Sequence, residues 1–286
     1  MEGRINLSSL EVKNDSIVIE NQKIHIDIYT ASKNPIGTVL FLHGNIFYSN
    51  SYNEFLSNLS QVGNINVVTF DYLGWGRSEG PRGKAQAKKI LEQIREMVKY
   101  TVKRFPNSKY AIIGDSMGGH FAFEALIDNP ELDCCVSHTI RYPGTYANMV
   151  DRIFVNLFRI MGLIMPNKTI NPLKEAVNAE PKKGGNPTYN KLLKDPKIVT
   201  SFDMKTIAEL TRVKSNKNHK TKKPVLIIVG EKEENKNEII LAKKASQILT
   251  NSQLEVVKDA GHLLFIDHPK LIADLITNWL KKVSFN

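Results

Sequence analysis

Cysteine is scarce in this chain, and it occurs in a place that excludes two of its usual roles. The only two cysteines among the 286 residues, Cys134 and Cys135, are adjacent and lie in an apolar stretch. Neighbours in sequence are poorly placed to form a disulfide with each other, and two thiols are too few for a metal site. We therefore expect two buried, reduced thiols, which is typical of a cytoplasmic protein.

Long apolar runs are also missing. No stretch of about 18 apolar residues occurs, so no membrane-spanning helix is expected. Residues Met1–Asn6 contain no basic stretch followed by an apolar segment, and no signal peptide is expected. The hydrophobic fraction of 42% and the charged fraction of 24% predict a folded globular protein with a sizeable core.

Positive charge exceeds negative charge by ten, and the excess is concentrated in one segment. Between Lys168 and Lys223 there are 14 basic and five acidic residues. This segment lacks a recognition helix or an aromatic RNA-binding motif, so no nucleic-acid partner is expected. Two interpretations remain: a solvated lysine-rich face, or a surface that attracts an acidic substrate or anionic lipid, which would place the protein peripherally at a membrane.

Short apolar runs alternate with amphipathic stretches along most of the chain. Strands are predicted at residues 16–20, 24–29, 38–42, 67–70, 110–113, 132–140, 225–229 and 254–257, and helices at 52–59, 84–105, 120–127, 238–249 and 269–283. This alternation predicts an α/β fold with a mostly parallel central sheet and helices on both faces. Residues 24–29 alternate apolar and polar side chains, which predicts a strand with one solvated face.

One segment interrupts the alternation. Residues 144–223 contain no clear strand, so we expect a core formed by residues 1–143 and 214–286, with a helical cap at 144–213. Such a cap would lie at the carboxyl end of the sheet, where open α/β sheets bind ligands. Its segment Arg152–Met165 is strongly apolar and rich in Met and Phe. It could pack on the core as a lid, line an acyl pocket or touch a membrane surface.

The most informative motif is Gly-Asp-Ser-Met-Gly at residues 114–118. An apolar strand precedes it and a helix follows it. In that context G-x-S-x-G forms a sharp turn that exposes the serine oxygen, and glycine is needed where a Cβ would clash with neighbouring backbone. The alternative is a plain glycine-rich turn in which Ser116 caps the helix.

Four segments together resemble the α/β-hydrolase family, and within it the monoacylglycerol lipase and lysophospholipase-like branch. They are the 114–118 motif, the His43-Gly44 turn, the loop Phe70–Gly80 and the sequence Asp-Ala-Gly-His at 259–262. Residues Asn190–Pro196, with the helix after them, are similar to the same branch. The resemblance implies the α/β-hydrolase fold and a serine hydrolase whose catalytic residues occur in the order serine, acid, histidine.

This resemblance implies specific roles. Ser116 is the expected nucleophile, and His262 is the base that takes its proton. The acid of the family falls on Glu233, where Asp is usual, and Glu234 is the alternative. The remaining histidines, at 25, 43, 120, 138, 219 and 268, are interpreted as structural, with His43 holding its turn and His25 lying in the solvated hairpin.

Further residues are expected to support the site. By the family pattern, the oxyanion hole uses the backbone N–H groups of Asn45 and Met117. Asp259 is expected to brace the histidine loop, and Asp71 its own loop. Asp115 precedes the serine and either raises the pKa of His262 or points into solvent.

These features predict an enzyme that cleaves carboxylic esters of medium or long acyl chains through an acyl-enzyme. The same machinery serves thioesters and amides, so a thioesterase, an amidase or peptidase, and a non-catalytic binding protein remain alternatives. The expected partner is a small acyl ester or lipid substrate. No cofactor and no metal are implied, and the oligomeric state is left open.

Overall fold

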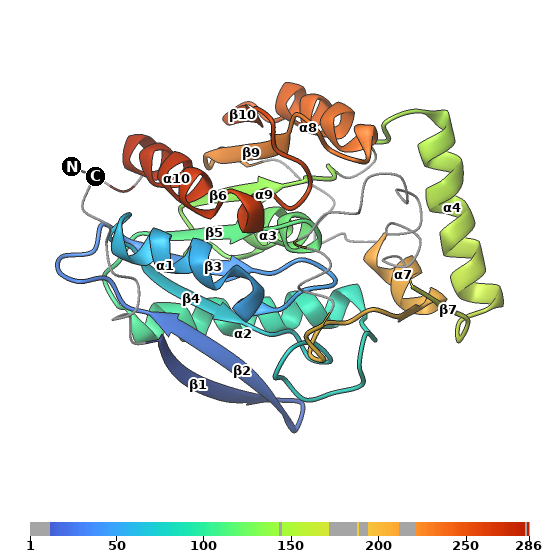
Figure 1. Cartoon of the computed structure of the whole chain (residues 1–286), viewed down its shortest axis with the longest axis horizontal. Coiled ribbons are helices and arrows are strands. Elements are labelled where there is room, and N and C mark those ends of the chain that lie inside the picture. The colour runs from blue at the N-terminus through green and yellow to red at the C-terminus, as the bar shows by residue number, and fades with distance from the viewer. Residues whose placement is uncertain are drawn as a thin grey trace.

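The computed structural model describes residues 12–142, 145–171, 188, 194–211, 221–283 and 285. Its centre is an eight-stranded sheet (Figure 1). In spatial order the strands are β1 (Val12–Ile19), β2 (Gln22–Tyr29), β4 (Asn66–Phe70), β3 (Thr38–Leu42), β5 (Tyr110–Gly114), β6 (Cys134–His138), β9 (Val225–Gly230) and β10 (Ser252–Val257). Strands β1 and β2 pair antiparallel, β2 is antiparallel to β4, and the other pairs are parallel.

Helices cover both faces of this sheet. On one face pack α2 (Ala87–Arg104), α3 (Met117–Asp128) and α8 (Lys236–Ile248). On the other pack α1 (Asn53–Gln61), which follows the short 3-10 helix η2 (Ser49–Tyr52), together with α9 (Leu264–Asp267) and α10 (Pro269–Val283). The predicted α/β architecture is therefore confirmed, and α9 is an element that the sequence pattern did not predict.

The two layers explain why the central strands are apolar throughout. In β3, Val39 and Phe41 pack beneath α1 and α10, whereas Leu40 and Leu42 pack beneath α2 and α3. Successive side chains of a strand point to opposite faces, so both sets must be apolar when both faces are covered. Cys134 and Cys135 belong to these two cores and are free and buried, as expected.

The prediction that residues 24–29 have a solvated face is wrong. Most of β2 is buried, and Asp27 is 2% exposed. Asp27 forms an ion pair with Arg77 of the loop after β4, and the His25 ring bonds the same carboxylate at 2.9 Å. The alternation of apolar and polar residues predicted the strand correctly, but the buried carboxylate of Asp27 meets the Arg77 guanidinium in place of water.

The expectation of no strand in the 144–223 segment is also incorrect. Two-residue strands β7 (Thr169–Ile170) and β8 (Phe202–Asp203) pair antiparallel between α4 (Met149–Ile164) and α7 (Met204–Leu210). Helix α4 stands at the right edge of the molecule in Figure 1, beside α7. A Cβ on Gly162 of α4 would lie 2.4 Å from the Cβ of Ala208, so a residue without a side chain permits this close approach.

The face of α4 turned away from α7 is apolar and exposed. Among the described residues, nine large apolar side chains of this helix and its ends are 46–71% exposed: Met149, Val150, Ile153, Phe154, Leu157, Ile160, Leu163, Ile164 and Met165. The buried positions of α4 are Asp151, Val155 and Gly162. The described part of the chain thus does not bury the apolar face of this helix.

Two further predictions fall partly or wholly outside the described residues. The similarity of Asn190–Pro196 includes 190–193, which are not described, and the helix after it is α7. His219 is not described either. Among the residues that are described, no helix is both long and apolar enough to cross a membrane.

Candidate active site

Ser116 lies at a sharp turn between β5 and α3. Its backbone has φ of 51°, which is unfavourable for a residue with a side chain. A Cβ on Gly114 would lie 2.1 Å from the carbonyl oxygen of Gly118, and one on Gly118 would lie 2.2 Å from that of Leu42. Ser116 makes no capping hydrogen bond to α3, so the alternative of a simple helix cap is not supported. The turn holds the serine side chain clear of the helix.

Three segments distant in sequence meet beside this turn. Nε2 of His262 lies 3.1 Å from the Ser116 hydroxyl oxygen, and Nδ1 of the same ring lies 2.9 Å from Oε2 of Glu233. His262 is on the loop after β10, and Glu233 is on the loop after β9. Both strands run parallel to β5, so their loops emerge at the same edge of the sheet as the serine.

The two candidate acids occupy different places. Glu233 is fully buried and contacts the His262 ring. Glu234 instead accepts a hydrogen bond from the backbone N–H of His262, at 3.1 Å. Glu234 therefore supports the histidine loop, and Glu233 is the carboxylate that can orient the imidazole.

His138, which the sequence pattern indicated only as a structural histidine, contacts the candidate acid. It ends β6, is completely buried, and its Nε2 lies 2.9 Å from Oε1 of Glu233. Its Nδ1 makes a short contact with Oδ1 of Asp115. A polar residue at the carboxyl end of a buried parallel strand, beside the strand that carries the serine, is the signal that could have identified it.

Asp115 does not point into solvent. Its carboxylate is buried between His138 and Tyr52, whose hydroxyl donates to Oδ2 at 2.6 Å. The negative charge of Asp115 contributes to a higher pKa of His262, although it does not touch that ring. Of the two alternatives for Asp115, the structure excludes the exposed one.

The pKa values of this cluster are mutually dependent. Burial alone would raise the pKa of Glu233, but hydrogen bonds from His138 and His262 lower it well below its ordinary value. Burial opposes protonation of His138, yet Asp115 and Glu233 outweigh it and raise its pKa to about 9. Burial likewise opposes protonation of His262, and its hydrogen bond to Glu233 leaves the pKa above the ordinary value. At neutral pH Glu233 is thus ionised and His138 is protonated.

The turn at His43 and Gly44 lies next to the serine. A Cβ on Gly44 would lie 3.5 Å from the Cβ of Ser116. His43 is buried and fixes the turn, as expected: its Nδ1 donates to the Gly44 carbonyl at 2.8 Å, and its Nε2 accepts from the N–H of Tyr72 at 3.2 Å. Burial lowers the pKa of His43, in keeping with a neutral ring.

The expected oxyanion donors flank the serine from two sides. Met117 begins α3 directly after Ser116, and Asn45 follows Gly44. Within the described part of the chain, neither backbone N–H donates to a protein acceptor. The carbonyl of Asn45 accepts a hydrogen bond from the indole of Trp75, which orients this peptide. Both N–H groups thus remain without a protein acceptor, as an oxyanion donor requires.

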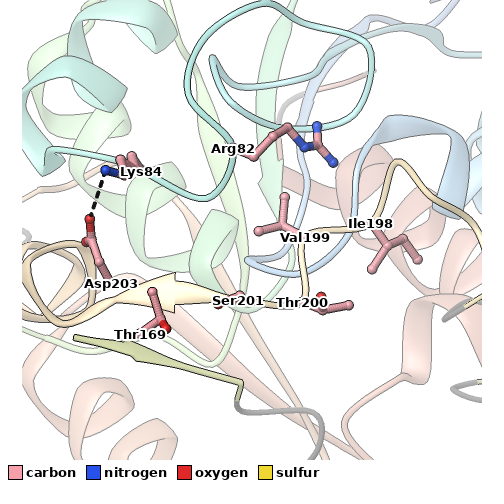
Figure 2. Close-up of a pocket in the computed structure, with 8 residues that line it drawn as sticks. All are labelled: Arg82, Lys84, Thr169, Ile198, Val199, Thr200, Ser201 and Asp203. Carbon is pink, nitrogen blue, oxygen red and sulfur yellow. Dashed lines mark ion pairs between the residues drawn. The ribbon is translucent and has the colours of Figure 1, made fainter. Parts of the chain in front are cut away.

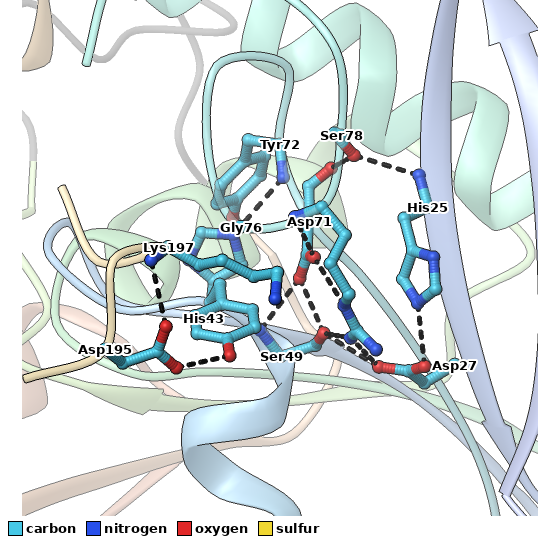
Figure 3. A network of polar contacts seen from close by, with 12 residues as sticks. His25, Asp27, His43, Ser49, Asp71, Tyr72, Gly76, Ser78, Asp195 and Lys197 are labelled. Carbon is cyan, nitrogen blue, oxygen red and sulfur yellow. Dashed lines mark hydrogen bonds and ion pairs between the residues drawn. The ribbon is translucent and has the colours of Figure 1, made fainter. Parts of the chain in front are cut away.

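A network of charged groups fixes the loops around the turn (Figure 3). Asp71 accepts from the backbone N–H groups of Ser49, at 2.9 Å, and Arg77, at 2.8 Å. The Arg77 guanidinium also bonds Asp27 and the Ser49 hydroxyl. Asp71 therefore braces its own loop, and in addition ties that loop to η2, which follows the candidate oxyanion turn.

Asp259 holds the loop before His262 through its backbone. Its N–H donates to Glu231 at 3.1 Å, and its φ of 59° turns the chain. Its exposed carboxylate pairs with Lys232 at 2.6 Å. These contacts join the loops after β9 and β10, which carry Glu233 and His262.

A cavity of about 250 Å³ lies beside the active-site loops but does not include Ser116, Glu233 or His262 (Figure 2). Its lining residues are Arg82, Lys84, Thr169, Ile198, Val199, Thr200, Ser201 and Asp203. Residues 195–199, which form part of this lining, are bonded to the loop that follows the His43-Gly44 turn. The N–H of Val199 donates to the Ile46 carbonyl at 3.0 Å, and the Tyr48 hydroxyl donates to Asp195 at 2.6 Å.

Among the described residues, His138, Glu233 and His262 form a group whose ligand-type atoms lie within 4.8 Å of one another. Each of these atoms already takes part in a hydrogen bond within the group. A metal ion bound there would have to replace both bonds to Glu233. The arrangement is that of a hydrogen-bonded chain.

Comparisons with known proteins identify the family to which this chain belongs. The family model Hydrolase_4, described as serine aminopeptidase S33, matches residues 33–269. A monoglyceride lipase homologue of Monkeypox virus is 26% identical over 216 residues, which are 74% of this chain and 76% of that protein.

Solved structures show the same fold at low sequence identity. A soluble variant of monoglyceride lipase from Saccharomyces cerevisiae, in complex with a substrate analogue, has a TM-score of 0.74 at 17% identity and covers 98% of this chain and 97% of its own. A thermostable carboxyl esterase from Bacillus coagulans, in complex with glycerol, has a TM-score of 0.76 at 14% identity and covers 96% and 99%. Matched by the family model over most of its length, and folded around the strand–turn–helix that presents Ser116, this chain belongs to the Hydrolase_4 (serine aminopeptidase, S33) family of α/β-hydrolases.

Proposed function

We propose that this protein is a serine hydrolase that cleaves carboxylic esters of acyl chains, of the monoacylglycerol or lysophospholipid type. The observation that carries the proposal is the continuous chain of contacts from Ser116 through His262 to Glu233. The virus relative is described as a monoglyceride lipase homologue, which supports the choice of substrate class.

In the first half of the reaction, the Ser116 oxygen attacks the ester carbonyl while His262 Nε2 accepts the hydroxyl proton. Glu233 keeps the other ring nitrogen protonated and stabilises the imidazolium that forms. The backbone N–H groups of Asn45 and Met117 are the donors for the negative oxygen of the tetrahedral intermediate. His262 then gives its proton to the departing alcohol, and an acyl-serine ester remains.

In the second half, a water molecule attacks the acyl-serine carbonyl and passes a proton to His262. A second tetrahedral intermediate forms and collapses, the C–O bond to Ser116 breaks, and the serine recovers the proton from His262. The products are a carboxylic acid and the regenerated hydroxyl. Every proton transfer uses one imidazole, so the contact of 3.1 Å between His262 and Ser116 serves both halves.

Residues 144–213 serve as a cap in this proposal. Helix α4 and the segment around α7 belong to it, and the exposed apolar face of α4 would contact an acyl chain or an anionic lipid surface. The lysine-rich part of the segment falls mostly outside the described residues. Because lysine side chains are attracted to anionic lipid, binding to phosphatidylglycerol vesicles should exceed binding to phosphatidylcholine vesicles at low salt. Equal binding to the two kinds of vesicle would show that charge does not contribute to binding.

The test of the catalytic proposal is covalent labelling followed by turnover. A fluorophosphonate should add its mass to Ser116 of the folded protein, and Ser116→Ala should abolish both labelling and hydrolysis. Matched esters, thioesters and anilides of one acyl chain then identify the bond that is cleaved. Absence of a Ser116 adduct on folded protein would refute the proposal, and preferential cleavage of the anilide or thioester would reassign the substrate class.

A further inference from the structure

We propose that His138 is a positioning residue for this hydrolysis: a doubly protonated imidazolium, bridging Asp115 and Glu233, that fixes the carboxylate facing His262. The inference rests on the proposed function. It assigns a role in the reaction to a side chain whose ring nitrogens contact Asp115 and Glu233 and not the serine.

The geometry determines where the protons lie. Nε2 of His138 is 2.9 Å from Oε1 of Glu233, and Nδ1 contacts Oδ1 of Asp115. An ionised carboxylate only accepts hydrogen bonds, so each ring nitrogen that faces one must carry a proton. A ring with both nitrogens protonated is a cation, and here it lies between two buried anions.

Among the described residues, the groups packed around His138 are aromatic rings, a second histidine and a tyrosine. The His262 ring lies 4.9 Å from the His138 ring, and the Phe265 ring of α9 lies 5.9 Å away. From α3, His120 faces the cluster, and burial and the nearby positive groups, Arg141 first among them, lower its pKa to about 3, so it is neutral. The hydroxyl of Tyr52 in η2 donates to Asp115 at 2.6 Å.

The bridge has a consequence for the orientation of the acid. Oε1 of Glu233 bonds His138 and Oε2 bonds His262, so rotation of the carboxylate would break both contacts. A Glu side chain has one more rotatable bond than the Asp expected at this place. His138 restrains that additional freedom, which explains how Glu233 can serve where Asp is usual.

The charge of His138 also affects the pKa of His262, the proposed base. Glu233 and Asp115 favour the protonated form of His262, whereas the positive charge of His138 disfavours it. The base must be neutral to accept the serine proton and must become positive in the intermediate. His138 cancels one of two nearby negative charges and so keeps His262 able to cycle between these forms.

The same cluster reaches the candidate oxyanion turn. Tyr52 donates to Asp115 at 2.6 Å, and its oxygen accepts from the N–H of Gly44 at 3.0 Å. A continuous path of hydrogen bonds therefore joins the turn that precedes Asn45 to the ring of His262, through Asp115, His138 and Glu233. His138 lies at the centre of this path.

The protonation state can be tested on the unaltered protein. In nitrogen-15 NMR of histidine-labelled protein, His138 should show two N–H protons between pH 6 and 8, and its signals are assigned by their loss in His138→Gln. A single ring proton on His138 in this range would overturn the proposal. This measurement does not depend on turnover, so it separates failure of the proposal from failure of the proposed function, which is decided by labelling of Ser116.

The role in the reaction is tested by pH profiles of kcat/KM for a soluble ester. His138→Gln removes the positive charge and should shift the acid limb to higher pH, with kcat reduced up to about 10²-fold, the loss that a displacement of about 1 Å can cause. Asp115→Asn should shift the limb to lower pH, and the double variant should return it toward the position of the unaltered protein.

His120→Gln is the matched control, because it replaces another histidine near the cluster, half-buried on α3, for which the described residues show no hydrogen bond to Glu233. It should leave the acid limb in place. Circular dichroism establishes that each variant is folded. An unmoved acid limb in folded His138→Gln, or equal shifts in the two histidine variants, would show that His138 is merely structural.

Discussion

The carboxylate of Glu233 lies 2.9 Å from Nδ1 of His262, whereas the adjacent Glu234 contacts only the backbone of that histidine. Replacing each one separately should therefore give very different enzymes. Glu233→Gln should lower kcat by about 10³-fold or more, because the amide no longer stabilises the imidazolium. Glu234→Gln should lower kcat by about tenfold at most, since it supports the loop and not the ring. Steady-state kinetics with a soluble ester makes the comparison, and equal losses would contradict the assignment of the acid.

The free energy of unfolding should decrease at alkaline pH, because the buried His138 loses its proton there. Its pKa in the folded protein is raised from 6.5 to about 9 by Asp115 and Glu233. This contribution to stability is fully present below pH 6.5 and is lost as the pH rises toward 9, by up to about 3 kcal/mol in total. Urea unfolding at several pH values should show this decline, and His138→Gln should lack it. A constant free energy of unfolding across this range in the unaltered protein would argue against a buried imidazolium.

Arg77 should be essential for folding stability because it neutralises two buried carboxylates. Asp27 and Asp71 are 2% and 0% exposed, and both pair with its guanidinium. Arg77→Met leaves both anions uncompensated, which should cost about 3–5 kcal/mol. Lys89→Met is the control, because its ion pair with Glu20 is exposed and should contribute no more than about 1 kcal/mol. Thermal unfolding compares the two, and similar melting temperatures would mean that solvent or rearrangement satisfies the aspartates.

The exposed apolar face of α4 should matter for lipid surfaces and not for soluble esters. Phe154 and Leu163 are 54% and 71% exposed, so replacing both with Ser should change stability by less than about 1 kcal/mol. Vesicle binding should fall by about tenfold or more, as expected for loss of two apolar side chains from the interface. Val18→Ser on β1, where Val18 is 70% exposed, is the matched control in vesicle sedimentation. Unchanged binding of the α4 variant would exclude this helix from the contact.

Most of the fold could be predicted from the sequence, because the spacing of apolar residues follows which side chains are buried. Apolar runs such as Thr38–Leu42 predicted strands covered on both faces, and β3 has those bounds. The prediction of a solvated face for β2 was wrong. A polar residue in the sequence must form hydrogen bonds or ion pairs, but the sequence does not show whether its partner is water or Arg77. Periodicity also could not predict α9, since four residues are too few to show a helical repeat.

The site was predictable where local chemistry is sufficient. Ser116 and His262 were selected from motifs, and the structure brings them together at 3.1 Å; Glu233 was selected by position on its loop. The sequence did not point to His138, because its contacts are with two carboxylates that follow other strands, Asp115 after β5 and Glu233 after β9. Contacts between residues 23 and 95 positions apart leave no local pattern in the chain.

The attachment of residues 194–203 to the loop after His43 has a mechanical consequence. Val199 bonds the carbonyl of Ile46, and Asp195 accepts from Tyr48, so this part of the proposed cap is joined to residues one and three positions beyond Asn45. Any displacement of this segment would therefore strain the residues that follow Asn45, whose backbone N–H is the proposed oxyanion donor.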